Sequence, residues 1–86
     1  MTFVVYMLRC ADGTFYVGWT KDVEARIHAH NHLKSGAKYT KARRPVELAY
    51  KETHPTLSAA LKREWALKQL KREEKLALTS SFSSLS

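Results

Sequence analysis

Residues 3 to 20 read Phe-Val-Val-Tyr-Met-Leu-Arg-Cys-Ala-Asp-Gly-Thr-Phe-Tyr-Val-Gly-Trp-Thr, and this stretch decides the fold. Residue types that favour strands, β-branched and aromatic, fill 3–9 and 15–20. The segment between them contains Asp12-Gly13, a pair common in tight hairpin turns. The stretch therefore predicts a β-hairpin.

The length of the hairpin loop determines which side chains share a face of the sheet. A two-residue loop would put Tyr6 and Tyr16 on opposite faces, because side chains alternate along a strand. A three-residue loop over 11–13, with Gly13 in the left-handed conformation, would instead place Tyr6 opposite Gly18 and make the two tyrosines diagonal neighbours. That register predicts space beside the Tyr6 hydroxyl for a phosphate or a water. The sequence alone leaves both registers open.

Helical segments and one more strand are predicted after the hairpin. Residues 21–33 contain no Gly or Pro and predict a helix with Thr20 as its N-cap. The alternating pattern over 46–50 predicts a third strand. Thr56 predicts the cap of a second helix that runs to about Lys71.

Residues 73–78 would extend the second helix or form a short third one. The order predicts an α+β fold with a small three-stranded, mainly antiparallel sheet flanked by helices, β-β-α-β-α-α. We expect one domain over 1–78, since a chain of 86 residues sustains one modest core. Five serines mark 79–86, which we expect to be a flexible tail.

The cellular setting is indicated by features that the sequence lacks. The apolar run over 3–8 is too short to span a bilayer and has no preceding basic stretch of the kind found in a signal peptide. The single cysteine, Cys10, can form neither an internal disulfide nor a cysteine zinc cluster, and we expect it to be a buried strand residue. We therefore expect a cytoplasmic protein with no membrane partner.

The chain is basic, with 15 Lys and Arg against 8 Asp and Glu and a formal net charge of +7. A field of this sign attracts polyanions, so nucleic acid is the expected partner. The second of two basic clusters comprises Lys62, Arg63, Lys68, Lys71, Arg72 and Lys75. The residues predicted to bind nucleic acid are those of the first cluster, its interleaved tyrosine and one lysine of the second: Lys34, Lys38, Tyr39, Lys41, Arg43, Arg44 and Lys68.

One carboxylate breaks the pattern of the second predicted helix. The apolar stripe of that helix is predicted to consist of Leu57, Ala60, Leu61 and Trp65. At about 100° per residue, Glu64 falls inside this stripe. A buried charge without a partner costs several kcal/mol, so Glu64 needs a cation or a metal. A salt bridge with Arg63, Lys68 or Arg26 is one answer, and a magnesium site completed by waters and a substrate phosphate is the other.

The first predicted helix carries a second group of polar candidates. Arg26 and His30 are one turn apart, on the side of the helix that also carries the apolar Val23 and Ile27. In addition, His28 and His32 are four residues apart and leave a zinc site as an alternative, although they point away from the apolar side and a third ligand is not evident.

Val4-Val5-Tyr6 and Tyr16-Val17-Gly18, about ten residues apart in a hairpin, resemble the two halves of the GIY-YIG nuclease signature. The resemblance continues in order through Arg26, His30 and Glu64. It covers about residues 3–72 and is closest to the small stand-alone members of that family.

This resemblance implies hydrolysis of a DNA phosphodiester with one divalent ion, Mg²⁺ or Mn²⁺. Tyr6 would take the proton from the attacking water, and Tyr16 would hydrogen-bond near the nucleophile or phosphate. Arg26 would neutralise the phosphate and Glu64 would hold the metal. His30 would orient Tyr6 or help to deprotonate it, because a tyrosine with an ordinary pKa near 10 is a poor base at neutral pH.

Further expectations follow the same resemblance. The DNA is duplex, nicked or branched, and repair or branched-DNA processing is the analogous pathway. We expect a monomer. Many catalytic members carry an asparagine about a dozen residues beyond the metal-binding glutamate, here near Leu76, but no asparagine follows Asn31. A second interpretation therefore stays open: a nucleic-acid-binding module that retains the fold without the chemistry and acts with a protein partner.

Overall fold

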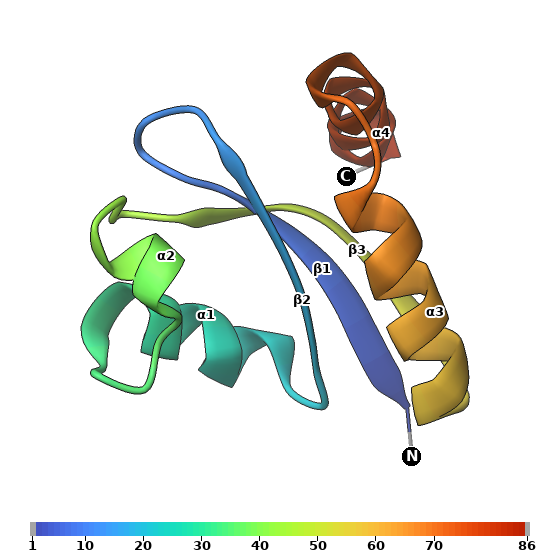
Figure 1. The fold of residues 1–86 in the computed structure, drawn as a ribbon, viewed down its shortest axis with the longest axis horizontal. Helices are drawn as coiled ribbons and strands as arrows, with labels where there is room; N and C mark the ends of the chain where they lie inside the picture. The colour runs from blue at the N-terminus through green and yellow to red at the C-terminus, as the bar shows by residue number, and fades with distance from the viewer. Residues whose placement is uncertain (1, 86) are drawn as a thin grey trace.

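A three-stranded antiparallel sheet forms the centre of the molecule in the computed structural model, which describes residues 2–85 (Figure 1). The strands are β1 (Phe3–Arg9), β2 (Phe15–Thr20) and β3 (Glu47–His54). Their spatial order is β2-β1-β3, so β1 is central and β2 is an edge strand. The predicted fold class and order of elements are confirmed.

Helices lie on both sides of this sheet (Figure 1). They are α1 (Val23–His32), the short α2 (Lys38–Lys41), α3 (Leu57–Lys68) and α4 (Arg72–Leu85). The first two lie on the side opposite α3, and α4 follows α3 near one end of the sheet. The short α2 lies in the lysine-rich segment and was not predicted. Within residues 2–85, the structure contains no helix with both the length and the hydropathy required for a membrane span.

The hairpin has the three-residue loop. The Cys10 amide donates to the Thr14 carbonyl at 2.8 Å, and the Gly13 amide donates to the Cys10 carbonyl at 2.9 Å. Gly13 has a φ of 85°, a conformation that residues with a Cβ rarely adopt. Tyr6 consequently lies opposite Gly18, and the two hairpin tyrosines share a face of the sheet.

Both faces of the sheet are packed with apolar side chains. On the α3 side, the buried cluster consists of Val5, Met7, Val17, Ala60 and Leu67. On the α1 side, it consists of Tyr6, Leu8, Cys10 and Val46, with the half-buried Val23 and Ile27 of α1 against it. The face that carries the tyrosines is therefore an interior face, covered by the first helix.

The predicted apolar stripe of α3 is wrong for three of its four members. Leu57, Leu61 and Trp65 are 38%, 42% and 67% exposed, whereas Ala60 is fully buried. Leu67, seven residues beyond Ala60, is the other buried residue of the helix. The small Ala60 side chain lets the helix sit close to the sheet, so the contact is narrow. Periodicity identified an apolar stripe but not which part of the helix meets the strands.

The start of α1 also differs from the prediction. Thr20 is the last residue of β2, and Asp22 is the N-cap, its carboxylate accepting from the Ala25 amide at 3.1 Å. The Thr20 hydroxyl instead accepts from the Asp22 amide at 3.2 Å and holds the turn between strand and helix. Thr56 does cap α3, as predicted.

The C-terminal segment is helical where a flexible tail was predicted. Residues 79–85 continue α4, and Ser86 lies outside the described residues. Thr79 is buried and its hydroxyl donates to the Leu76 carbonyl at 2.9 Å. The Phe82 ring packs edge-on against Tyr50 of β3, with ring centroids 5.9 Å apart. The serine-rich composition obscured these two inward-facing side chains.

The first residue of α4, Arg72, is hydrogen-bonded to the hairpin loop. Arg72 donates from Nη1 to the Gly13 carbonyl at 2.7 Å, across 59 positions of sequence. Its guanidinium also lies 5.5 Å from the centroid of the Phe15 ring. The loop of the first two strands is thus closed by a residue of the last helix.

Candidate active site

Tyr6 lies across the backbone of Gly18 on the edge strand β2. A Cβ built at Gly18 would be 2.7 Å from the Tyr6 hydroxyl oxygen and 2.9 Å from the ring carbon that bears it. Only glycine fits such an approach. The space predicted here for a phosphate or water is filled by the Tyr6 ring, and that prediction is wrong, because the ring is 1% exposed and packs down on the strand.

His30 is the buried partner of Tyr6. Its side chain projects from α1 and is fully buried, with Nε2 2.9 Å from the Tyr6 hydroxyl. Its other ring nitrogen, Nδ1, is 2.8 Å from the hydroxyl of Thr40 in α2. Tyr16 packs edge-on against the same imidazole, with centroids 5.1 Å apart. The structure thus brings Tyr6, Tyr16 and His30 together.

The contacts of Thr40 determine the tautomer of His30. The Thr40 hydroxyl has one proton and donates it to the Ala37 carbonyl at 2.9 Å. It must therefore accept from His30, so Nδ1 carries the imidazole proton. Nε2 then has a free lone pair, and the Tyr6 hydroxyl donates to it. Thr40 is fully buried and was missed, because nothing in its sequence neighbourhood indicates that α2 places it under α1.

Burial moves the pKa of both partners away from neutrality. It raises the pKa of Tyr6 to about 12, against the lowering effect of the nearby Arg26 guanidinium. It lowers the pKa of His30 to about 4, and the positive charges of Arg26 and Arg44 act in the same direction. At neutral pH Tyr6 is therefore a phenol and His30 a neutral imidazole.

Arg26 of α1 lies close enough to influence both members of this pair. Its Nη1 donates to the Ser35 carbonyl at 3.1 Å, which holds the half-buried side chain in place. A guanidinium has five N–H donors in a planar fork that suits a phosphate. The residue predicted to neutralise a phosphate is thus next to the tyrosine.

Glu64 approaches from α3, on the other side of the sheet. Its negative charge acts to raise the pKa of Tyr6, which places the carboxylate within electrostatic reach of the hydroxyl. The side chain is 19% exposed, and its ion-pair partner is Lys68, with Nζ 3.9 Å from Oε1. Arg63 turns away and pairs with Glu52 at 2.5 Å. An ion pair of this length with a half-exposed lysine contributes little stability, so the Glu64 carboxylate remains available as a metal ligand.

The donor set suits a lightly coordinated ion. Across residues 2–85, no cluster of three or more His, Cys, Asp or Glu side chains is arranged to hold a metal. Glu64 alone would provide a protein ligand, the arrangement in which magnesium keeps several waters and binds phosphate. His28 and His32 lie side by side, with centroids 4.8 Å apart, but both are exposed and no third ligand is grouped with them within residues 2–85.

The basic segment after α1 borders the tyrosines. Tyr39 stacks on Tyr16 with centroids 6.0 Å apart, and the Arg43 guanidinium lies 3.8 Å from the centroid of the Tyr39 ring. Arg43 also forms a salt bridge with Asp12 at 3.0 Å, which joins the segment to the hairpin loop. Three lysines of the segment are exposed: Lys34, Lys38 and Lys41. They form a charged rim next to the candidate site.

Arg44, in the same segment, stabilises the C-terminal end of α1. Its Nε donates to the His30 carbonyl at 2.5 Å and its Nη2 to the Leu33 carbonyl at 2.7 Å. Carbonyls at the C-terminal end of a helix lack partners within the helix, and a cation there also offsets the helix dipole. Arg44 therefore caps α1, and its effect on a bound anion would come from its charge.

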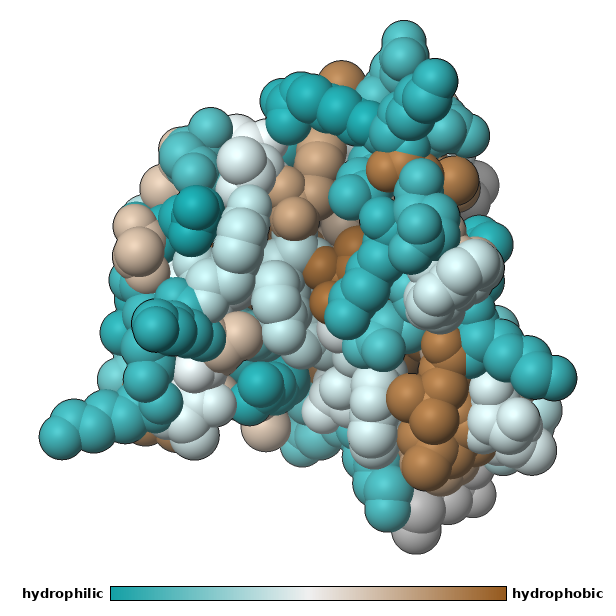
Figure 2. All heavy atoms as spheres, in the orientation of Figure 1, coloured by the Kyte–Doolittle hydropathy of each residue, from teal (hydrophilic) through white to brown (hydrophobic). Residues whose placement is uncertain are grey.

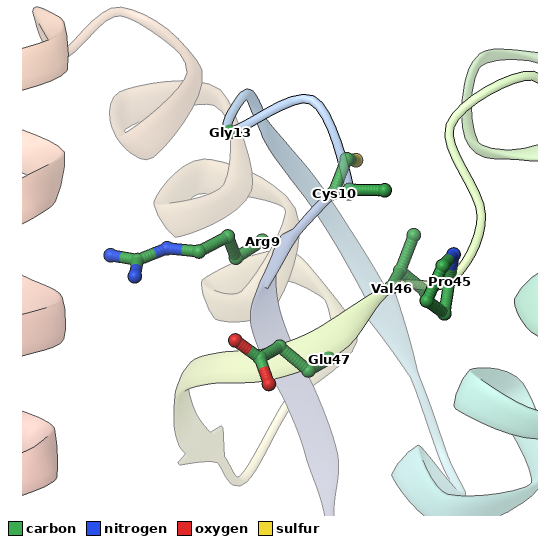
Figure 3. A pocket seen from close by; sticks show the side chains of 7 residues that line it. Arg9, Cys10, Gly13, Pro45, Val46 and Glu47 are labelled. Carbon is green, nitrogen blue, oxygen red and sulfur yellow. The ribbon is translucent and has the colours of Figure 1, made fainter.

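A separate cleft of about 370 Å³ lies between the hairpin loop and the start of β3 (Figure 3). Its lining residues are Arg9, Cys10, Ala11, Gly13, Pro45, Val46 and Glu47, a set that includes none of the five candidate catalytic residues. Burial raises the pKa of the Cys10 thiol, which disfavours the reactive thiolate. Cys10 is buried, as expected, but lies one residue beyond the end of β1 and not within a strand, and the cleft does not include Tyr6.

The chain is similar to known proteins over most of its length. Residues 2–77 match the family described as the GIY-YIG catalytic domain. A UPF0213 protein of Staphylococcus epidermidis is 55% identical over 74 residues, which cover 86% of this chain and 89% of that protein. A UPF0213 protein of Staphylococcus aureus is 53% identical over the same coverage.

Two solved structures are also similar. The solution structure of the UPF0213 protein BH0048 from Bacillus halodurans is 40% identical, with a TM-score of 0.59 over 93% of this chain and 84% of that one. The solution structure of EF2693 from E. faecalis is 39% identical, with a TM-score of 0.64 over 96% of this chain and 88% of that one.

Proposed function

Because this chain belongs to the GIY-YIG family, we propose that it is a DNA endonuclease that hydrolyses phosphodiester bonds with one divalent metal ion. The observation that carries the proposal is the buried hydrogen bond from Tyr6 to Nε2 of His30, 2.9 Å long, within the electrostatic influence of Arg26.

Glu64 would hold the ion, Mg²⁺ or Mn²⁺. When bound, such an ion neutralises phosphate charge and stabilises the leaving oxygen. The fit rests on the chemistry of the carboxylate: it is largely buried, loosely paired with Lys68 at 3.9 Å, and near enough to Tyr6 to affect its pKa.

The protein's own groups would move the proton. Tyr6 would take a proton from the attacking water while passing its own to Nε2 of His30, so that no free phenolate forms. A phosphate bound at Arg26 would offset the positive charge that helps to depress the pKa of His30, and the imidazole would become a better acceptor. Tyr16, which packs edge-on against His30 and stacks on Tyr39, would hydrogen-bond to the phosphate or the nucleophile.

The charged rim would bind the DNA backbone. Its three lysines, Lys34, Lys38 and Lys41, would act together with Tyr39 and Arg43 of the same segment, with Lys68 on the α3 side and with the charge of Arg44. We further propose that the protein acts as a monomer in the cytoplasm on duplex, nicked or branched DNA, in repair or the processing of branched DNA.

The test is cleavage of labelled single-stranded, nicked, branched and duplex DNA by the purified chain with magnesium or manganese. Cleavage should require the metal and fall by about 10²-fold or more in Glu64→Gln and in Tyr6→Phe. Glu73→Gln is the matched control, because Glu73 is an exposed acid at the start of α4. Intact DNA in every arm, at every salt concentration tried, would refute the enzyme.

A binding module without chemistry is the second candidate. It is favoured by one observation: Leu76, near which many catalytic relatives carry an asparagine, is a half-buried apolar residue of α4. This candidate predicts DNA binding that weakens with salt and survives Glu64→Gln, with no metal-dependent cleavage.

A further inference from the structure

The outer surface of α3 carries an apolar strip that the sheet does not cover. Leu57, Leu61 and Trp65 are spaced four residues apart, so they lie in one row along the helix. Trp65 is 67% exposed, the highest value among the large apolar side chains that the structure describes. Figure 2 shows hydrophobic side chains at the surface over α3, bordered by hydrophilic ones. An indole left in water without a packing role is available to a ligand.

The strip lies directly beside Glu64. Leu61 precedes Glu64 by three residues and Trp65 by four, so it is a surface neighbour of both. Arg63 lies on the other flank of Glu64 and reaches Glu52 on β3. Since the helix turns by about 100° per residue, Trp65 lies on the flank away from β3, which is the side of the edge strand β2. Tyr6 extends across that same strand at Gly18.

The charges around the strip favour a polyanion over a second copy of this chain. Lys62 and Lys68 are each three residues from Trp65, are its neighbours on the helix surface, and are both exposed. A second copy would bring its own lysines and its own +7 charge against them. An aromatic face between two cations instead matches single-stranded DNA, whose bases stack on aromatic rings while its phosphates meet lysines.

We propose that Trp65, supported by Leu61, stacks an unpaired base of the DNA strand whose phosphate lies at Glu64, and so gives the site a preference for single-stranded or frayed DNA. This inference rests on the proposed function, because it takes DNA at Glu64 as the ligand. It does not depend on cleavage, since stacking is a binding event.

The experiment uses the full chain without divalent metal, so that the DNA stays intact. Trp19→Phe leaves Trp65 as the single indole, because the sequence contains two tryptophans. Oligothymidine of about 12 nucleotides should quench Trp65 emission, and a hairpin duplex of equal charge should quench it far less. Fluorescence anisotropy of labelled DNA then compares binding by Trp65→Ala, Trp65→Phe and Leu33→Ala.

Trp65→Ala should weaken binding of the single strand by about tenfold, in the range known for one stacked base, and leave duplex binding nearly unchanged. Trp65→Phe should retain most of the affinity. Leu33→Ala is the control, because Leu33 is also exposed, at 44%, but ends α1 on the other side of the sheet. Equal losses for both DNA forms, or no quenching, would overturn the inference while leaving the nuclease proposal intact.

Two further outcomes separate the proposals. Quenching and a tenfold loss without any cleavage would support the stacking surface and refute the enzyme. Trp65 emission that shifts to the blue as protein concentration rises, without DNA, together with a dimer in sedimentation, would mean that a second copy occupies the strip and would overturn the stacking inference.

Discussion

At the scale of single residues, the site depends on a chain of three side chains with one consistent direction of donation. Tyr6 donates to His30, His30 donates to Thr40, and Thr40 donates to the Ala37 carbonyl. The three side chains are buried, so the loss of one link leaves a buried polar group without a partner at a cost of about 1–3 kcal/mol.

Thr40→Val tests the last link of that chain. It keeps the shape of the side chain but removes both the acceptor for Nδ1 of His30 and the donor to Ala37. The free energy of unfolding should fall by about 1–3 kcal/mol, and Thr40→Ser should recover most of it. Urea denaturation gives the energies, and nitrogen NMR of the imidazole should show Nδ1–H both in the unmodified chain and in the Thr40→Ser variant. An Nε2–H tautomer in the unmodified chain would contradict the assignment.

His30 should also make stability depend on pH. Its pKa is about 4 in the folded protein and about 6.5 when unfolded, so between these values the unfolded chain binds more protons. Stability is therefore full above about pH 6.5 and falls as the pH drops toward 4, with a loss of about 2 kcal/mol at pH 5. Urea midpoints measured across this window should decline in the natural chain and stay flatter in His30→Gln. If the urea midpoints of the two proteins declined equally with falling pH, groups other than His30 would be responsible for the pH dependence of stability.

Tyr6 and Tyr16 became candidates through the resemblance to the GIY-YIG signature, whereas Arg26, His30 and Glu64 also carry polar groups beside predicted apolar positions. Glu64 interrupts an apolar helix, and His30 with Arg26 borders an apolar side. Thr40 gave no such signal, since a threonine among lysines is ordinary in a loop. Its role depends on a tertiary contact between α1 and α2 that no local pattern encodes.

At the scale of elements, the sequence restricted the hairpin register to two choices, whereas it did not identify the face of α3 that contacts the sheet. Asp12-Gly13 restricts the loop to two lengths, and side-chain alternation then determines everything downstream of that choice. The apolar residues of α3 predict its orientation less well. The small Ala60 makes the contact with the sheet, whereas the larger Leu57 and Leu61, about one turn away or less, stay exposed. The helix face was therefore misjudged, while the two hairpin strands were placed correctly and β3 extends four residues beyond the predicted end of the third strand.

Gly18→Ala tests the close approach within the hairpin. The added methyl would meet the Tyr6 hydroxyl at 2.7 Å, and the buried ring could yield only by leaving His30. We expect a loss of about 1–3 kcal/mol in the free energy of unfolding and, under the proposed function, a loss of cleavage. The loss should be smaller when the same change is made in Tyr6→Phe, because the nearest atom is then absent. Equal losses in the two backgrounds would show that the hydroxyl is not the obstacle.

At the scale of the whole molecule, the +7 charge is distributed on both sides of the site. The segment after α1, which includes α2, carries Lys34, Lys38 and Lys41, and α3 carries Lys62 and Lys68. A strand that passes Glu64 would therefore meet lysines before and after the scissile position.

Lys38→Ala should weaken DNA binding and reduce the slope of log affinity against log salt by about 0.7 to 0.9, the value for one lost phosphate contact. Lys71→Ala is the matched control, because Lys71 is exposed directly before α4 and is not among the residues predicted to bind nucleic acid. Its slope should equal that of the unchanged protein. Equal reductions by the two variants would mean that binding reports net charge and not the charged rim.

The bond from Arg72 to the Gly13 carbonyl has a consequence for how the protein is made. A ribosome releases the hairpin early, but the residue that closes its loop emerges 59 positions later. Glu64 likewise follows Tyr6 by most of the chain. A nascent chain can therefore pair its first two strands long before it contains either Arg72, which closes the loop, or Glu64, so under the proposed function no cleavage can precede the synthesis of α3.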